Sequence, residues 1–389
     1  MTLEMEFNIM LSESVLERSR LEQMERKLFT PLQIRGITLK NRVCVPALVM
    51  YARKNQEGFV EEADVAHYRA LAEGGFGLVI VEAACVSPEG KLVEQQLGAW
   101  DDKFIPGLRQ LADAIHQGGS RALLQIHHAG LIAVDGDRVT ASDDACDYRA
   151  VSAIPGEYRM KHYTGRAATV DEILRIEDCF GEAARRAEAA GFDGVEIHGA
   201  HNYLISQFLS SAVNRREDEY GQTERFALEV FRKVRAAVSD DFLVGIRLGG
   251  FDPKLEDGLR HAKALAEAGV DFLNMSRGFA LRHQAWKPEG FPFNELIYGA
   301  QEVKKMVDVP VFAVSGINSA EMAEDVLQTT GVDMVCIGRG ALVNPNWAVD
   351  AQAGRDTGKC LNCPACYWRG HRPDCPGMTR LERIREQES

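Results

Sequence analysis

The stretch Gly191-Phe-Asp-Gly-Val-Glu-Ile-His-Gly-Ala-His-Asn-Tyr203 shows most directly how this chain folds. An amphipathic pattern over Asp171–Ala190 precedes it, its first glycines make a turn, and the apolar run that follows is typical of a buried strand. The run ends in polar residues, so that His198, His201 and Tyr203 leave the strand end together. This succession of helix, turn and strand recurs through most of the chain.

Eight short apolar runs alternate with amphipathic segments from Leu28 onward. The runs are Arg42–Val45, Leu78–Ala83, Ala122–His127, Gly194–His198, Leu243–Leu248, Phe272–Ser276, Val311–Val314 and Met334–Ile337. Helical patterns fill gaps between them, as at Asp102–Gln117, Asp171–Ala190, Glu224–Val238, Asp257–Ala268, Phe293–Met306 and Ser319–Thr329. This alternation predicts an α/β protein with a (β/α)8 barrel. An open doubly wound sheet would need a glycine-rich turn after its first strand, whereas Gly74-Gly-Phe-Gly77 precedes a strand.

Length and composition set the broad class. The 389 residues are 46% hydrophobic and 26% charged, which is ordinary for a soluble globular protein. The sequence shows neither an apolar run long enough to cross a membrane nor a secretory signal, so we expect a cytoplasmic protein. A net charge of −12 argues against nucleic acid or an anionic membrane as partner. We expect an N-terminal arm at 1–27, the barrel at 28–350 and a cysteine-rich segment at 351–389; a homo-oligomer is compatible with the sequence.

The carboxyl ends of barrel strands form the mouth of an active site. The predicted mouth collects Pro46, Ala47 and Tyr51 from the first run, Ala83 from the second, Gln125, His127 and His128 from the third, and His198, His201 and Tyr203 from the fourth. The fifth run adds Arg247, a cation that is expensive to bury unless it meets negative charge.

Glycines follow the seventh and eighth runs, in Ser315-Gly316-Ile317 and Ile337-Gly338-Arg339-Gly340. Glycine lets a ligand approach backbone N–H groups, and an arginine adds a fork of donors, so we expect a phosphate cradle here. A flat space beside small alanines, with Gln125 and Arg247 at its centre, fits flavin mononucleotide (FMN). Arg247 would then face the ring edge where negative charge gathers on reduction. The alternative is a structural ion pair between Arg247 and a core carboxylate such as Glu82 or Glu196.

These segments resemble the old yellow enzyme family of flavin-dependent ene-reductases. The similar motifs are Lys40-Asn-Arg-Val43, Leu124-Gln-Ile-His-His-Ala-Gly130, Glu196-Ile-His-Gly-Ala-His-Asn-Tyr-Leu204, Asn214-Arg-Arg-Glu-Asp-Glu-Tyr-Gly221 and Ile337-Gly-Arg339. The resemblance implies that FMN is bound by Gln125, Arg247, Gly316, Gly338 and Arg339 and lined by Pro46, Ala47 and Ala83. It also implies that His198 and His201 bind a substrate carbonyl oxygen, that Tyr203 donates a proton, and that Tyr51 contacts the substrate.

The chemistry of these residues agrees with those roles. An α,β-unsaturated carbonyl accepts hydride at its β carbon only if the enolate oxygen is stabilised, which two histidine donors can do. A nearby tyrosine can protonate the α carbon. The histidines could instead be metal ligands or packed core residues, and Tyr203 a core aromatic. Two positions depart from the family: Val49 replaces a flavin-tuning cysteine, and Tyr220-Gly-Gln-Thr-Glu-Arg225 is shortened.

Cysteines are distributed unevenly. Five of the nine are scattered and are expected to be small buried residues, whereas Cys360, Cys363, Cys366 and Cys375 crowd together near the C-terminus. Three close thiolates and a remote one suit a [4Fe–4S] cluster, with zinc as the alternative. The segment resembles the cluster segment of 2,4-dienoyl-CoA reductases and trimethylamine dehydrogenase, which also carry a second nucleotide-binding module. Because the chain stops before such a module, we expect electrons from NAD(P)H or from a ferredoxin or flavoprotein partner, and favour the partner.

The leading functional hypothesis is therefore an FMN-dependent reductase of activated C=C bonds in enones, enoates or enoyl thioesters. A flavin and iron–sulfur amine dehydrogenase or demethylase is the second hypothesis, because of the spacing of the cysteines. A flavin electron carrier is the third. Substrate specificity is expected to lie in loops at 133–168 and 279–293, the latter with Arg282, His283, Trp286 and Lys287.

Overall fold

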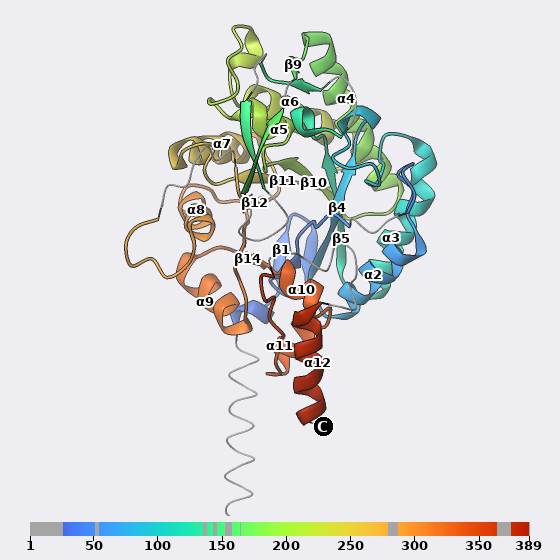
Figure 1. Ribbon diagram of the computed structural model, residues 1–389, viewed down its shortest axis with the longest axis vertical. Helices are drawn as coiled ribbons and strands as arrows, with labels where there is room; N and C mark the ends of the chain where they lie inside the picture. The colour runs from blue at the N-terminus through green and yellow to red at the C-terminus, as the bar shows by residue number, and fades with distance from the viewer. Residues whose placement is uncertain are drawn as a thin grey trace, which may run out of the picture.

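Eight parallel strands form a closed barrel at the centre of the protein (Figure 1). The computed structural model describes residues 26–50, 54–134, 138–142, 146–151, 158–163, 165–278, 287–363 and 375–388. The barrel strands are β3 (Val43–Val45), β4 (Leu78–Cys85), β5 (Arg121–His127), β10 (Gly194–Gly199), β11 (Leu243–Gly249), β12 (Leu273–Ser276), β13 (Val311–Val314) and β14 (Met334–Cys336). Each pairs with the next barrel strand, and β14 pairs with β3 to close the ring. The predicted (β/α)8 barrel is confirmed.

Helices surround the barrel between successive strands (Figure 1). They are α2 (Glu62–Glu73), α3 (Ile105–Gln117), α4 (Val170–Ala189), α6 (Arg225–Ala236), α7 (Leu255–Ala268), α8 (Glu295–Lys304) and α9 (Ala320–Thr330), followed after β14 by α10 (Arg339–Val343) and α11 (Trp347–Gln352). Local sequence sets their ends. Thr169 and Glu172 form a capping box at the start of α4, and Gly331, with φ of 75°, ends α9 in the left-handed conformation.

Apolar side chains pack in two layers. The larger layer lies between strands and helices, and the smaller fills the barrel interior. Inside the barrel, the rings of Phe272 and Phe312 stack with centroids 4.7 Å apart. Gly245 faces them, because a Cβ at this position would come within 2.2 Å of the Phe272 ring. The interior is therefore a packed core, and only the ends of the strands can form a site.

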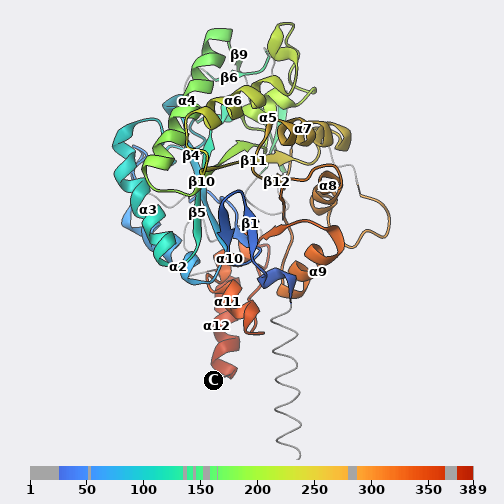
Figure 2. The ribbon, with the colours of Figure 1, turned by 180° about the vertical axis from the view of Figure 1, so that it is seen from behind.

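A β-hairpin closes the end of the barrel where the strands begin. It consists of β1 (Leu32–Ile34) and β2 (Ile37–Leu39), paired antiparallel. Its apolar side chains pack into the interior layer together with the first residues of several strands, such as Leu78 and Leu243. Figure 2, the view from behind, shows this hairpin in blue in front of the barrel. The carboxyl ends of the strands, at the opposite end, are left for the site.

Further short elements depart from the regular alternation. Between β5 and α4, β6 (Val139–Thr140) pairs with β9 (Arg166–Ala167), and β7 (Cys146–Val151) pairs with β8 (Tyr158–Tyr163). The short helix α5 (Leu204–Leu209) follows β10 directly. Single 3-10 turns lie at Lys27–Phe29, Pro88–Gly90, Asp102–Phe104, Gly130–Ile132 and Glu219–Gly221. The paired strands occupy the expected specificity loop at 133–168, for which the sequence predicted no strands.

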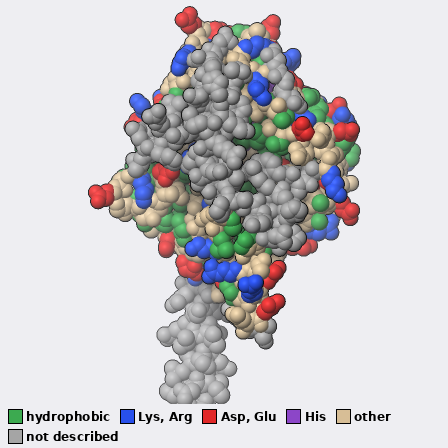
Figure 3. Space-filling view, in the orientation of Figure 1, with side chains coloured by type: hydrophobic (Ala, Val, Ile, Leu, Met, Phe, Trp, Pro, Cys, Tyr) green, Lys and Arg blue, Asp and Glu red, His purple; other side chains and the backbone are tan. Residues whose placement is uncertain are grey.

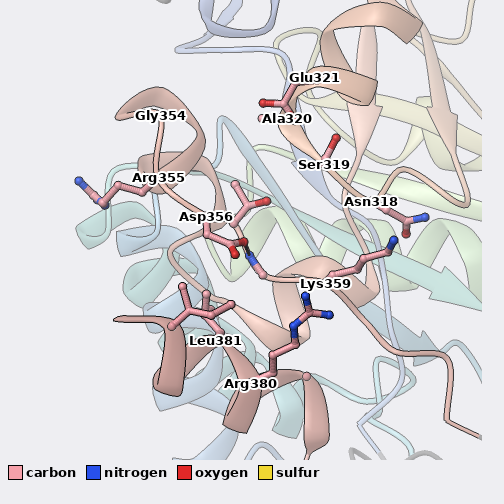
Figure 4. A pocket seen from close by; sticks show the side chains of 14 residues that line it. Asn318, Ser319, Ala320, Glu321, Gly354, Arg355, Asp356, Lys359, Arg380 and Leu381 are labelled. Carbon is pink, nitrogen blue, oxygen red and sulfur yellow. Dashed lines mark hydrogen bonds between the residues drawn. The ribbon is translucent and has the colours of Figure 1, made fainter. Parts of the chain in front are cut away.

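The C-terminal segment packs back onto the barrel through a buried carboxylate. Helix α12 (Pro376–Glu388) sends Arg385 to Asp350, at 2.5 Å, and Arg355 binds the same side chain at 2.7 Å. A pocket of about 370 Å³ remains between this segment and the start of α9. Lys359 and Arg380 reach into it from the segment, opposite Asn318, Ser319 and Glu321 (Figure 4). The expected boundary between the barrel and the cysteine-rich segment, at residue 350, is not tested by these contacts and stays a prediction.

Charged side chains of both signs are scattered over one face of the protein. Figure 3 shows them interspersed around the rim of this face, with Lys and Arg gathered lower down, over the C-terminal helices. None of the helices in the described part of the chain is long and apolar enough to cross a membrane.

Candidate active site

A buried carboxylate organises polar residues near the carboxyl ends of the strands. Glu196 on β10 is fully buried and accepts hydrogen bonds of 2.6 Å from the amides of Gln125 and Asn274. Burial raises the pKa of Glu196, while the charge of Arg247 and the two amide bonds act in the opposite direction. These amides are thereby fixed in orientation, because their N–H groups face the carboxylate.

Arg247 on β11 is also buried, with 6% of its surface exposed. Its Nη1 donates to the carbonyl oxygen of Ala47 at 3.3 Å, and its Nη2 donates to the hydroxyl of Ser276 at 3.3 Å. Its Nε is buried without a partner among the described residues. Within the described residues no ion pair joins Arg247 to Glu196, whose two oxygens instead accept from the amides of Gln125 and Asn274. An unsatisfied cationic donor at the mouth fits a ligand with an electron-rich edge.

Three histidines and a serine form a connected chain beside Arg247. The Nδ1 atoms of His127 and His198 are 3.0 Å apart, and His198 Nε2 lies 3.0 Å from His201 Nδ1. His201 Nε2 lies 2.7 Å from the hydroxyl of Ser276. Burial is the first cause that lowers the pKa of each ring, to about 3 for His127 and well below the ordinary value for His198 and His201. All three imidazoles are therefore neutral near pH 7.

The backbone that carries His201 is strained. His201 and Asn202 have φ of 59° and 64°, in the left-handed region that residues other than glycine avoid. Two hydrogen bonds hold this turn: His201 N donates to the carbonyl of Arg277 at 3.0 Å, and Gln207 Nε2 donates to the carbonyl of Asn202 at 2.7 Å. Strain of this kind persists only where the surroundings enforce it, and it is concentrated at functional sites.

Tyr203 packs its ring against this histidine chain. It begins α5, and its ring meets His127 edge-on at 4.5 Å between centroids and His198 at 4.8 Å. The structure thus brings together the three residues that the sequence predicted for catalysis, His198, His201 and Tyr203.

The predicted phosphate loops lie at the ends of the neighbouring strands β13 and β14. Gly316 has φ of 70°, and a Cβ there would lie 2.7 Å from Asn294 Nδ2. That amide donates to the carbonyl of Ser315 at 2.9 Å, while the side-chain oxygen of Asn294 caps α8. A Cβ at Gly338 would be 3.5 Å from Pro46, which places these two predicted residues side by side.

Two other predicted residues are fixed by neighbours that the sequence did not suggest. The carbonyl of Ala83 accepts a 2.8 Å bond from buried Gln96, next to an irregularity in the pairing of β4 and β5. Arg339 is exposed and donates to the side chain of Asn362 in the cysteine segment. Tyr51, like Arg282, His283 and Trp286, lies outside the described residues.

The cysteine site is described only in part. Cys360, Cys363 and Cys375 are free and partly exposed, and Cys366 lies outside the described residues. Within the described ranges no three His, Cys, Asp or Glu side chains are arranged to hold a metal ion. The predicted set of four thiolates therefore stays a prediction.

Sequence reasoning missed several residues that support the site. Ser276 and Asn274 were not singled out, although polar residues at alternating positions of an apolar strand were a usable signal. His127 was placed at the mouth without a supporting role, and Glu196 was considered only as an ion-pair partner of Arg247. Asn294 gave no signal, because it lies in a loop and reaches the site only through the fold.

Comparison with known proteins places the chain in a family. The sequence pattern of the NADH:flavin oxidoreductase / NADH oxidase family matches residues 27–358. The NADPH dehydrogenase of Bacillus subtilis (strain 168) is 36% identical over 355 residues, which are 89% of this chain and 100% of that protein. The NADH oxidase of Thermoanaerobacter brockii is 36% identical over 86% of this chain, but the chain spans only about half, 52%, of its length.

Comparison with solved structures agrees with this family. Morphinone reductase in complex with tetrahydroNAD superimposes with a TM-score of 0.69 and 28% identity, over 86% of this chain and 92% of that one. The family match ends before Cys360, so the likeness of the cysteine segment to 2,4-dienoyl-CoA reductase and trimethylamine dehydrogenase stays a prediction. Because the match covers most of the chain and the Bacillus subtilis protein is matched over its whole length, this chain is an oxidoreductase that belongs to the NADH:flavin oxidoreductase / NADH oxidase family.

Proposed function

We propose that this oxidoreductase uses FMN to reduce the C=C bond of an α,β-unsaturated carbonyl compound. The observation that carries the proposal is a pair of neutral histidines, the buried His198 and the partly buried His201, joined at 3.0 Å beside the ring of Tyr203. These groups can stabilise a developing oxyanion and supply a proton, which are the two tasks that such a reduction sets for the protein.

The residues at the mouth fit FMN. Small residues and glycines leave room for a ring and a phosphate, the amide of Gln125 is oriented by Glu196, and the unpartnered Nε of Arg247 requires an acceptor. The holding residues would be Pro46, Ala47, Ala83, Gln125, Arg247, Gly316, Gly338 and Arg339. When bound there, FMN supplies hydride to the β carbon of the substrate.

The two histidines would bind the carbonyl oxygen. Hydride arriving at the β carbon drives negative charge onto that oxygen, and donors placed in advance lower the energy of this state. Each histidine is neutral and carries a single ring N–H, which can donate a hydrogen bond to the carbonyl oxygen. In the ligand-free arrangement His198 Nε2 and His201 Nδ1 share one hydrogen bond, so a carbonyl oxygen would take over the proton of His198, while His201 would have to turn its other nitrogen, Nε2, from Ser276 toward the oxygen.

Tyr203 would protonate the α carbon. Replacing Tyr203 with phenylalanine keeps the edge-on packing and removes the acid, so kcat for an enone should fall by roughly 100-fold, within the range for general acid catalysis. Flavin content measured by absorption is the control. Unchanged enone reduction with flavin bound would overturn the role of Tyr203, although the histidine clamp would survive that result.

NAD(P)H is the favoured electron donor. Relatives are named NADH oxidase and NADPH dehydrogenase, and the morphinone reductase structure contains tetrahydroNAD. A ferredoxin or flavoprotein partner is the alternative that the cysteine segment suggests. Anaerobic stopped-flow mixing with NADH or NADPH distinguishes them: rapid flavin reduction that is unchanged in Cys363→Ser rules out an obligatory partner.

The cysteine segment is proposed to hold a [4Fe–4S] cluster through Cys360, Cys363, Cys366 and Cys375. The support is their spacing, which provides three close thiolates and a remote one. Anaerobically purified protein should then contain about four iron atoms per chain. Cys363→Ser should lose iron and keep flavin, whereas zinc in the purified protein would contradict the proposal.

Positive charge near the histidines argues against oxidation of an amine. Arg247 and Arg277 both lower the pKa of His201, and the same charges would repel an ammonium group placed there. Mixing reduced enzyme with enones and enoyl thioesters, and oxidised enzyme with methylated amines, separates the two activities. Reoxidation of the flavin by enones alone supports the proposal, and reduction of the flavin by amines alone refutes it.

A further inference from the structure

His127 is the residue of the histidine chain to which the proposed mechanism gives no role. It lies at the end of β5, is fully buried, and places its Nδ1 3.0 Å from Nδ1 of His198. Its other nitrogen, Nε2, is buried without a partner in the described part of the chain. Its ring also packs edge-on against Tyr203, at 4.5 Å. His127 therefore touches two of the three proposed catalytic residues.

His127 and His198 share one proton between their Nδ1 atoms, so the tautomer of one ring depends on the tautomer of the other. A neutral imidazole has one N–H and one bare nitrogen. Two nitrogens 3.0 Å apart attract only when one of them carries a proton, because two bare nitrogens or two N–H groups repel each other. If His198 is to donate from Nε2, its Nδ1 is bare, and the proton between the rings must belong to Nδ1 of His127. The tautomer of His127 thus determines that of His198.

Burial does not set the direction of this bond. Nε2 of His127 is buried without a partner in the described part of the chain, and either tautomer leaves it unsatisfied, as a bare nitrogen or as an N–H group, at a cost of about 1–3 kcal/mol. Arg247, at the other end of the chain, acts through the hydroxyl of Ser276. A hydroxyl both donates and accepts, so Ser276 does not impose a direction on the histidines.

We propose that His127 is a positioning residue, whose Nδ1–H bond to His198 holds the single proton of His198 on Nε2. Nε2 is the nitrogen that faces His201 and that would donate to a carbonyl oxygen. His127 itself acts through His198 and does not bind the substrate. The tautomers belong to the resting protein and can be measured there, but their assignment and their use in catalysis rest on the proposed function.

The direct test is nitrogen NMR of the holoenzyme, because the two ring nitrogens of a neutral imidazole differ according to which of them carries the proton. Protein labelled with ¹⁵N in its histidine rings, with oxidised flavin bound, gives separate patterns for the two tautomers. His128 is an internal reference: its Nδ1 accepts from Gly130 N at 3.0 Å, so its proton is on Nε2. His127 should carry its proton on Nδ1 and His198 on Nε2. A proton on Nδ1 of His198 overturns the proposal.

Two variants test the consequence for turnover. His127→Phe keeps a ring against Tyr203 but cannot donate, whereas His127→Asn places an amide N–H close to the former Nδ1. With 2-cyclohexenone, kcat/KM should fall at least tenfold in the Phe variant and less than about threefold in the Asn variant, the range expected when a donor is lost or kept. Equal losses at equal flavin content overturn the proposal. If the wild-type enzyme reduces no enone, the proposed function fails, and the NMR result alone decides the inference.

Discussion

Gly316→Ala should weaken flavin binding through a contact that the structure defines. Gly316 has φ of 70°, and the added Cβ would lie 2.7 Å from Nδ2 of Asn294. The Asn294 amide cannot simply move away, because it donates to the carbonyl of Ser315 and its oxygen caps α8. The substitution therefore strains the backbone and also displaces the side chain that fixes the loop.

Both contributions can be estimated, and the chain offers a matched control. A left-handed conformation costs an alanine roughly 1–2 kcal/mol. Losing the Asn294 bond adds about 1 kcal/mol. Gly331 has φ of 75° with nothing within 4 Å of the added Cβ, so Gly331→Ala should suffer only the first cost. If the additional cost of about 1 kcal/mol acts on flavin binding, the FMN affinity of the Gly316 variant should be about fivefold to tenfold lower than that of the Gly331 variant. A free energy of about 1.4 kcal/mol corresponds to a factor of ten in affinity.

Denaturant unfolding of the flavin-free variants and fluorescence titration with FMN measure the two effects separately. Removing the obstructing amide with Asn294→Ala provides the second control, because the extra loss caused by Gly316→Ala should shrink in that background. Equal FMN affinity of the Gly316 and Gly331 variants would refute both the predicted phosphate loop and the importance of the contact.

Three further predictions concern stability. Burial raises the pKa of Glu177 to about 7, so the folded protein holds this proton at pH values where the unfolded chain has lost it. The wild-type protein should therefore lose stability as pH rises from near 4.5 through 7. Glu177→Gln should lessen that dependence, which unfolding measured from about pH 5 to 8 would show. Asp350→Ala removes the buried carboxylate that Arg385 binds and leaves it, among the described residues, only the amide oxygen of Asn344, so limited proteolysis should release α12 sooner while the barrel persists. Gly245→Ala forces a methyl group into the Phe272 ring and should lower the free energy of unfolding by at least about 2 kcal/mol; an unchanged denaturation midpoint would contradict this.

The barrel could be predicted because its strands are buried on both faces. Such strands appear in the sequence as nearly continuous apolar runs, so polar residues at their ends are conspicuous. Gln125 and Arg247 were recognised in this way, and the structure holds both at the strand ends, with Gln125 bonded to Glu196 and Arg247 to Ala47.

The supporting contacts could not be predicted, because they depend on the register between strands that are distant in sequence. His127 meets His198 across 71 positions, and His201 meets Ser276 across 75. The hairpin of β1 and β2 was not predicted because its strands alternate buried with more exposed side chains over only three residues, whereas the equally short β3 and β14 are continuous buried apolar runs. Its Leu32 and Leu39 are recognisable as core residues only when the open end of the barrel is known.

The hydrogen bond from Arg339 to Asn362 has a thermodynamic consequence. Asn362 lies between Cys360 and Cys363, so a residue of the predicted phosphate loop is tied to the cysteine segment. A ligand that draws Arg339 away breaks this tie, and a metal that fixes the cysteines alters the freedom of Arg339. If both groups bind as proposed, the linkage is reciprocal, and any change in flavin affinity on occupation of the segment equals the change in the affinity of the segment on flavin binding. The coupling through Arg339 is then the same whichever of the two groups binds first.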